Sequence, residues 1–399
     1  MKKGFFSFIN LYLLLWIVYE LQFFIFGSSG TLYSQLILLF LMSFSLYFMV
    51  YSLLKYRLPS YMKALTWLLL MFTIYGGLLI ASPTVITHSS VVVSKYSYLQ
   101  TIFISLLPIY PFYVYTRKGI IQKRHIQFWT VIFFVAVTLE YFQNQQLLLI
   151  NAEEIGSNQE EFTNNIGYVF LTLIPLLAFF SRKQLAQYIG LAYVIVFMLL
   201  SMKRGAIFIG ALCVLLFLYL SLKGVNRNRR AFAIIMGMIV IAVGYYVVIH
   251  LLENSAFFIA RVEETIEGDS SGRDLLYSGF LSHFIGESNF FRLLFGNGAY
   301  STLRIMDQYA HNDWLEIAIN QGVLGLFVYA VYWVTFYKSL KKSRFDDEVH
   351  IALCVLFLCY FLRTIFSMSY GDMTICSTLC LGYSMGKISE TTLALRASI

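Results

Sequence analysis

The sequence predicts an all-α, polytopic integral membrane protein with about twelve transmembrane helices and one large extracytoplasmic loop. Two features of the composition indicate this class: 59% of the 399 residues are hydrophobic, and only 13% are charged. Soluble domains carry about 25% charged residues. The apolar residues also form long blocks, and a helix needs about 20 mostly apolar residues to cross the hydrocarbon core. Residues 1–399 are therefore expected to form a single transmembrane domain.

Windows of that length give twelve candidate spans. Two of them are less regular, because 126–142 is short and 165–181 contains Pro175. The first stretch is longer than the apolar core of a signal peptide and ends without a small-residue cleavage site, so it is expected to remain as a helix. The predicted spans are 7–26, 32–54, 64–82, 97–116, 126–142, 165–181, 185–202, 205–222, 231–251, 314–337, 349–368 and 372–388.

The basic residues support this count independently, because lysine and arginine concentrate in cytoplasmic loops. With the N-terminus inside, twelve spans place most of the 29 basic residues on the cytoplasmic side and bring the C-terminus to the same side. We therefore expect a multi-pass protein of a bacterial plasma (inner) membrane with both termini in the cytoplasm. The net charge of +8 then acts as a topology signal with some attraction to anionic membrane lipids, and it requires no nucleic-acid partner.

Two predicted extracytoplasmic loops are longer than a turn. The smaller, 143–164, is polar and acidic, and the larger, 252–313, is the main hydrophilic stretch of the chain. The basic residues of the larger loop are all arginines: Arg261, Arg273, Arg292 and Arg304. A planar guanidinium matches two phosphate or carboxylate oxygens at once, which an ammonium group cannot do. Two interpretations remain open, namely that the arginines bind an anionic substrate or that each pairs with an acidic residue of the same loop.

Three further basic residues lie at or near the extracytoplasmic ends of predicted spans. Lys203 and Arg204 form, with Gly205, a tight connection between two spans, and Arg363 lies about one turn below the end of its own span. A charge within a span is costly and usually faces a cavity or a partner. The alternatives are contact with lipid headgroups for Lys203 and Arg204, and snorkelling to the surface for Arg363.

A histidine begins the tenth predicted span. His311 and Asn312 precede a helix that contains Gly322 and Gly325. On a continuous helix, His311 and Gly322 would share one stripe about 16 Å apart, which places the histidine above a glycine-lined groove. A histidine at a helix start is more often a cap or a structural residue than a catalytic base.

The pattern His311-Asn312, nine residues, Gly322-x-x-Gly325 resembles the signature of the O-antigen ligase and O-antigen polymerase superfamily, the WaaL and Wzy proteins. Arg204 resembles the family's arginine at the head of a helix, and Arg273, after Gly272, resembles the arginine early in its large periplasmic loop. The turn Gly296-Asn297-Gly298 resembles the glycine turn that precedes the family's histidine. The resemblance covers the chain from about residue 165 onward.

This resemblance implies a glycosyltransferase with a GT-C-like membrane fold that uses an undecaprenyl-diphosphate-linked oligosaccharide as donor. Arg204 and Arg273 would hold the diphosphate, and His311 would act as general base on the acceptor hydroxyl. The extracytoplasmic side has no Asp-x-Asp pair, so the reaction is expected to need neither metal nor cofactor, and direct displacement would invert the anomeric carbon. Possible supporting residues are Lys203, Asn312, Asp313, Glu316, Arg292, Arg304 and Arg363.

Three functions remain open at this point. A polymerase of O-antigen or capsule repeat units would transfer the glycan to another lipid-linked unit, and it is the preferred reading. A ligase of lipopolysaccharide biosynthesis would transfer the glycan to lipid A–core. A transporter or flippase of lipid-linked glycans would instead place its polar groups near the membrane midplane. A chain-length regulator is a further partner that a polymerase would have.

Overall fold

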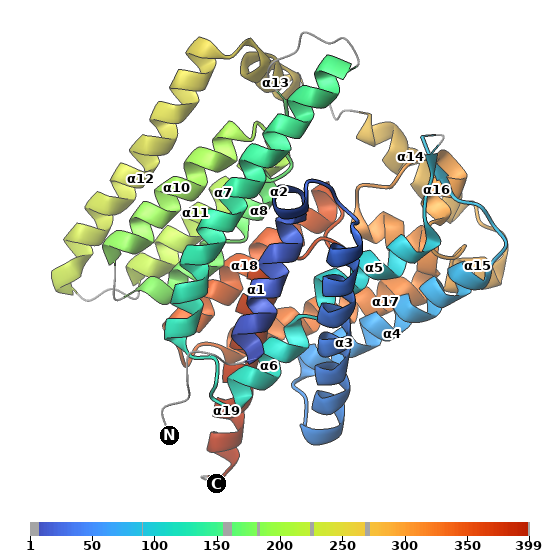
Figure 1. Ribbon diagram of the computed structural model, residues 1–399, viewed down its shortest axis with the longest axis horizontal. Helices are drawn as coiled ribbons and strands as arrows, with labels where there is room; N and C mark the ends of the chain where they lie inside the picture. Colours follow the sequence, from blue (N-terminus) through green and yellow to red (C-terminus); the bar gives the residue numbers. More distant parts are fainter. Residues whose placement is uncertain are drawn as a thin grey trace.

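The computed structural model describes residues 8–89, 91–154, 162–181, 184–223, 227–267 and 272–397. About 81% of the chain is helical. In the described part, eight helices are long and apolar enough to cross a membrane. The fold is that of an all-α membrane protein, as the composition predicts (Figure 1).

The helices vary widely in length, and those that pack within the bundle are mostly the longest. In chain order they are α1 (Phe8–Glu20), α2 (Gln22–Phe26), α3 (Leu32–Lys55), α4 (Ser60–Ala81), α5 (Lys95–Leu106), α6 (Ile109–Arg117), α7 (Lys123–Glu154), α8 (Gly167–Leu171), α9 (Ile174–Leu177), η1 (Ala178–Phe180), α10 (Gln184–Leu200), α11 (Arg204–Lys223), α12 (Arg227–Asn254), α13 (Ala256–Ile266), α14 (Arg273–Ile285), α15 (Phe290–Phe295), α16 (Ser301–Met306), α17 (Asp313–Lys342), α18 (Asp347–Phe366) and α19 (Ile375–Ala397). A short antiparallel pair, β1 (Thr87–His88) and β2 (Val91–Val92), joins α4 to α5.

Each of the twelve expected spans overlaps helical structure, but several are interrupted or short. The span expected at 97–116 is divided into α5 and α6 at Pro108, because a proline lacks the amide hydrogen that continues a helix. The span expected at 165–181 is divided into α8, α9 and η1, with the break just before Pro175. Three apolar helical segments, Phe8–Glu20, Gly167–Phe180 and Gln184–Leu200, are shorter than a full span.

The two expected loops contain more helix than the sequence suggests. Helix α7 continues to Glu154, so the first half of the segment 143–164 is helical, while residues 155–161 lie outside the described residues. The segment 252–313 begins in the last turn of α12 and then contains α13, α14, α15 and α16. It is therefore a folded layer of short helices.

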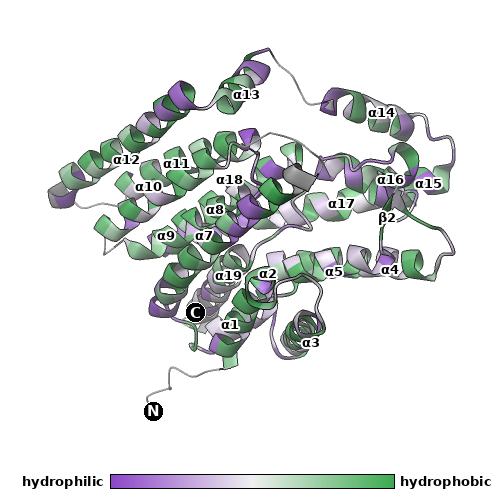
Figure 2. Ribbon diagram, turned by 45° about the horizontal axis from the view of Figure 1, so that its top comes forward, coloured by the Kyte–Doolittle hydropathy of each residue, from purple (hydrophilic) through white to green (hydrophobic). Residues whose placement is uncertain are grey.

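This layer of short helices lies at one end of the bundle. In Figure 1, α13 and α14 are at the top, whereas the end of α19 is at the bottom. Helices α13 and α14 each have a hydrophilic end and an otherwise largely hydrophobic body, and hydrophobic residues predominate along α12 (Figure 2). We call the end that carries α13 to α16 the large-loop end. The residues of interest lie there.

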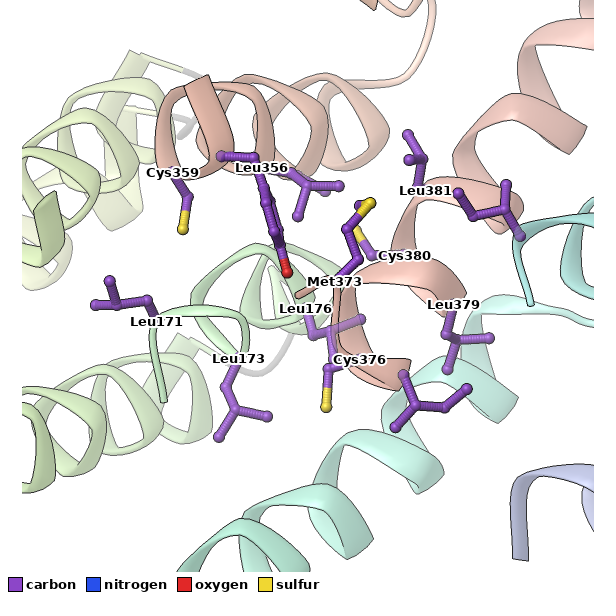
Figure 3. Close-up of a cluster of buried hydrophobic side chains, with 14 of the residues drawn as sticks. Leu171, Leu173, Leu176, Leu356, Cys359, Met373, Cys376, Leu379, Cys380 and Leu381 are labelled. Atoms are coloured by element: carbon purple, nitrogen blue, oxygen red, sulfur yellow. The ribbon is translucent and has the colours of Figure 1, made fainter. Parts of the chain in front are cut away.

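The core beneath that end is apolar and closely packed. Leu171 and Leu176, from the broken segment α8–α9, belong to one buried cluster with Leu356 of α18 and Leu379 of α19 (Figure 3). Cys359, Cys376 and Cys380 are buried free thiols in the same cluster. They pack as small apolar side chains, as their positions within predicted spans suggest. This core joins α8, α9, α18 and α19 into one support for the large-loop end.

Candidate functional site

The turn that carries His311 is fixed by hydrogen bonds on both of its sides. Asn312 caps α17, because its side chain accepts hydrogen bonds from the backbone amides of Trp314 and Leu315 at 3.0 and 3.1 Å. On the other side, the amide of Ala310 donates to Glu316 Oε2 at 2.8 Å. Between these two anchors, His311 has φ = +49°, a left-handed conformation that is uncommon for residues other than glycine. Such strained residues concentrate at functional sites.

The carboxylates of Asp313 and Glu316 are buried and fully engaged, but not by the imidazole ring. Asp313 accepts from the Tyr329 hydroxyl at 2.5 Å and from the amide and hydroxyl of Ser369 at 2.8 and 2.5 Å. Glu316 accepts from Thr302 Oγ1 and Asn320 Nδ2 as well as from Ala310. Among the described residues, neither carboxylate is therefore hydrogen-bonded to the imidazole ring of His311. Glu316 positions the backbone next to His311 instead.

The end of α18 forms a second support for the turn. Its last carbonyls have no partner within the helix, and three side chains of the site donate to them. Asn312 Nδ2 lies 3.2 Å from the Ile365 carbonyl, and Arg273 Nη1 lies 2.8 Å from the Phe366 carbonyl. The Tyr277 hydroxyl lies within hydrogen-bond distance of the carbonyls of both Ile365 and His311. Tyr277 is a site residue that sequence reasoning missed, since a lone tyrosine on a short helix gives no signal.

Basic residues surround the imidazole of His311. Its pKa is lowered from the ordinary value of 6.5, first by partial burial and then by the positive charges of Arg273 and Lys203. The pKa of Lys203 is lowered in turn by burial and by the charges of Arg273, Arg261 and Arg204. Hydrogen bonds place Arg273 beside this turn, because it donates to the Phe366 carbonyl, next to the Ile365 carbonyl that Asn312 and Tyr277 contact. Lys203 precedes Arg204 at the start of α11, and its charge also acts on the imidazole of His311.

Two of the clustered arginines share a carboxylate. Arg261 Nη1 lies 2.7 Å from Glu264 Oε2, and Arg204 Nη1 lies 3.6 Å from the same oxygen and 3.5 Å from Thr265 Oγ1. For Arg204 and Arg261, pairing with a nearby acid is thus the arrangement in the structure. Arg273 differs, because no salt bridge among the described residues includes it.

The imidazole ring of His311 is available to bind a substrate. Among the described residues, no hydrogen bond to either of its ring nitrogens is present, and the residue is half-buried. His88, in the strand pair, contributes to the lowered pKa of His311, and its ring lies against that of Tyr309 at an angle of 42°, with centroids 5.3 Å apart. His88 is a second residue near the site that the sequence did not indicate.

Arg363 does not belong to this cluster. It is 1% exposed and forms an ion pair with Asp372, whose side chain is 62% exposed. Its guanidinium also lies 4.8 Å from the centre of the Tyr168 ring and 5.2 Å from that of Tyr360. Arg363 therefore faces a partner, one of the two arrangements expected for a charge within a span, and it does not snorkel to the surface. A contact between Arg363 and substrate stays a prediction.

Arg292 and Arg304 lie on short helices of the same end, in a different place. Arg304, on α16, donates through Nη2 to the Asn297 carbonyl and to Ser301 Oγ, both at 2.5 Å. Partial loss of hydration and the nearby charge of Arg292 lower the pKa of Arg304. The large-loop end thus carries two groups of cations, one around His311 and one around Arg304.

Gly322 breaks α17, which the sequence analysis treats as one straight helix. Gly322 has φ = +68° and ψ = −162°, so the helix stops and restarts there. The carbonyls of Ile319 and Asn320, left without helical partners, accept from the amides of Asn297 and Gly298, each at 2.9 Å. The expected stripe from His311 to Gly322 is therefore absent, and the glycine contacts the backbone of the turn after α15.

Gly325 also allows close packing within the broken helix. A Cβ atom on Gly325 would lie 2.3 Å from the Cβ of Gln321 and 3.1 Å from Cγ2 of Ile317. The second half of α17 can therefore lie against the end of the first half. Gly322 and Gly325 are therefore both needed for the break in α17.

The site therefore offers a histidine with an available ring beside several fixed cations. This arrangement can accept a proton from a hydroxyl group and can stabilise an anionic leaving group. Within the described residues, no group of three histidine, cysteine or acidic side chains is placed to hold a metal ion. No family model matches the chain, and a search of curated proteins finds no match either.

Proposed function

We propose that this protein is a membrane glycosyltransferase that uses a lipid-diphosphate-linked glycan as donor at the extracytoplasmic face. The observation that carries the proposal is that Arg273 donates to the end of α18 where Asn312 and Tyr277 hold the turn of His311. Arg273 and His311 are 38 positions apart in sequence, and they are the positions that resemble the family's substrate-binding arginine and catalytic histidine. The charges of Arg273 and Lys203 also lower the pKa of His311. The large-loop end is then the extracytoplasmic end of a twelve-span bundle, and both termini are cytoplasmic.

In this mechanism, the cations bind the diphosphate and His311 acts on the acceptor. Arg273, Lys203 and Arg204 stabilise the negative charge that develops on the diphosphate as the glycosidic bond breaks. His311 accepts the proton of the acceptor hydroxyl as that oxygen attacks the anomeric carbon. The new bond forms on the face opposite the leaving diphosphate, so the configuration is inverted.

The preferred reaction is the polymerisation of O-antigen or capsule repeat units in a bacterial plasma membrane. The alternative, ligation to lipid A–core, uses the same chemistry with another acceptor. The transporter alternative has less support, because the cations and the available histidine gather at one end of the bundle and Arg363 is occupied by Asp372. Transporters place their sites near the midplane, between repeated halves.

The decisive experiment is a transfer assay with the purified protein and a lipid-linked repeat unit. A polymerase is expected to convert it into a ladder of longer lipid-linked glycans. In the cell, loss of a polymerase leaves single units attached to the core, whereas loss of a ligase leaves a bare core and accumulated lipid-linked polymer. If the purified protein forms no longer glycans and the deletion strain makes normal glycans, the proposal is wrong.

The pH dependence of the reaction gives a further prediction. Burial and the charges of Arg273 and Lys203 destabilise the imidazolium form, so His311 remains a neutral base below pH 6.5. In the pH profile of kcat/KM, the acidic limb is the fall in activity as His311 becomes protonated. This limb is therefore expected below pH 6.5. In Arg273→Gln, the limb is expected to move to higher pH, by up to about one unit.

The matched control is Arg229→Gln, which removes one positive charge from the first turn of α12. This variant should leave the acidic limb where it is in the wild type. An acidic limb that is unchanged in Arg273→Gln would show that Arg273 does not act on the group that titrates.

A further inference from the structure

A groove runs along the membrane-facing side of the bundle, on the side of α17 where α15 packs. It lies between α4, the turn after α15 and the second half of α17, and its volume is about 810 Å³. This is within the range of sites that hold a small molecule. Its walls are mainly apolar, with Trp67, Ile74 and Leu78 from α4 and Leu324 and Val328 from α17.

The groove opens toward the lipid. Trp67 and Leu78 are each 65% exposed, and exposed apolar residues on a spanning helix face the hydrocarbon region. From Trp67 to Leu79, α4 rises about 18 Å, which is comparable with one leaflet of a hydrocarbon core about 30 Å thick. The groove therefore has the length and the chemistry to accept a lipid chain from the side.

At the large-loop end, the lining of the groove becomes polar and positively charged. Arg304 and Asn297 line this end together with Ser82. Lys95 adjoins it, because its ammonium group donates to the carbonyl of Ser82. No salt bridge among the described residues includes Arg304, Lys95 or the neighbouring Arg292. Cations without a carboxylate partner at the end of an apolar groove complement a lipid whose head is a phosphate.

The wall of the groove is built from direct backbone contact. A Cβ atom on Gly296 would lie 2.4 Å from the Asn320 carbonyl carbon, and one on Gly322 would lie 2.5 Å from the Gly296 amide nitrogen. The Tyr75 hydroxyl, from α4, donates to the Phe295 carbonyl and links the two sides. The break in α17 therefore shapes the groove.

We propose that this groove binds the chain of the lipid-linked acceptor, and that Arg304 and Lys95 bind its phosphate. This inference rests on the proposed function, in which His311 receives two lipid-linked substrates. The segment 299–310 separates the groove from the cations around His311. Two polyanionic lipids in one cationic cluster would repel each other, and two separate clusters avoid that repulsion.

Aromatic rings lie along the segment between the groove and His311. The ring centroids of Tyr300 and Tyr309 lie 6.1 Å apart, and the Tyr309 ring lies against His88 at an angle of 42°. The charge of His88 contributes to the lowered pKa of His311. We therefore expect a sugar attached to a phosphate at Arg304 to extend past Tyr309 toward His311.

Binding can be tested directly with Trp67, which lines the groove. The protein in lipid nanodiscs is titrated with a polyprenyl phosphate that carries bromine atoms on its terminal isoprene units, and with the brominated polyprenol as uncharged control. The quenching due to Trp67 is the fluorescence quenching of the wild type minus that of Trp67→Phe. We expect the phosphate to bind at least about tenfold more tightly than the polyprenol, because charge-assisted hydrogen bonds hold its head.

The double variant Arg304→Gln/Lys95→Gln is expected to lose this preference, and the control Arg57→Gln is expected to keep it. Equal binding of phosphate and polyprenol by the wild type would mean that the groove holds only bulk lipid, and the inference would be wrong. A preference that survives in the double variant would overturn it as well.

Kinetics separate this inference from the proposed function. In the transfer assay, Arg304→Gln is expected to raise the KM for the acceptor about tenfold and to leave the KM for the donor unchanged. An unchanged acceptor KM in an active enzyme would overturn the acceptor groove while the transferase proposal stands. If quenching is selective for the phosphate but the protein has no transfer activity, the groove binds lipid phosphates and the transferase proposal is wrong.

Discussion

Replacing His311 with asparagine is expected to lower kcat for glycan transfer by about 10²- to 10⁴-fold, the usual contribution of a general base. Asparagine is chosen because His311 has φ = +49°, and asparagine adopts this conformation more readily than most residues. The variant should therefore keep the turn between Ala310 and Asn312 and lose only the proton acceptor. The measurement is the rate of product formation by purified protein under saturating substrates.

The control for this variant is His125→Asn, at the opposite end of the bundle, which should keep full activity. Thermal unfolding in detergent should be the same for the wild type and for His311→Asn. A stable His311→Asn protein with normal kcat would remove His311 from the mechanism.

Replacing Gly322 with alanine is expected to destabilise the protein by about 3 kcal/mol or more. The backbone of Gly322, with φ = +68° and ψ = −162°, belongs to a region that almost only glycine adopts. A Cβ atom there would lie 2.5 Å from the Gly296 amide nitrogen and 2.6 Å from the carbonyl oxygens of Leu293 and Leu294. These are backbone atoms, so no side-chain rotation relieves the contact. The shift in thermal unfolding in detergent measures the effect.

Gly77→Ala is the matched control, because Gly77 lies in α4 and a Cβ atom there would meet no atom within 4 Å. Its stability should match the wild type or exceed it slightly, since alanine favours helices over glycine. If Gly322→Ala unfolds at the same temperature as Gly77→Ala, the break in α17 is not required for the fold.

The class of the protein and the positions of its helices follow from the sequence, because hydropathy is a local property. An apolar segment in lipid forms a helix because the helix satisfies its own backbone hydrogen bonds. Each expected span overlaps helical structure, although several spans are interrupted or short. The proline breaks at Pro108 and Pro175 are also local effects, and only the second of these residues lies where the sequence analysis expected an irregular span.

The site was predictable only in part. The residues brought around His311 include Lys203 and Arg273, which the sequence singled out by residue type and spacing. The roles of Asp313, Glu316 and Arg363 were not predictable, because each depends on partners distant in the chain: Ser369 for Asp313, Thr302 for Glu316 and, across the turn after α18, Asp372 for Arg363. Burial turns these charged residues into structural ones.

By itself, the sequence determined the membrane class, the long apolar helices and the candidate histidine and arginines. These follow from the length of the apolar stretches, the positions of the basic residues and a short motif, all of which are local along the chain. Only the tertiary structure decided that α17 is broken at Gly322, because the break is stabilised by amides from the turn after α15. It also decided that the cations form two groups, one around His311 and one around Arg304, since that arrangement depends on how α13 to α16 fold over the bundle.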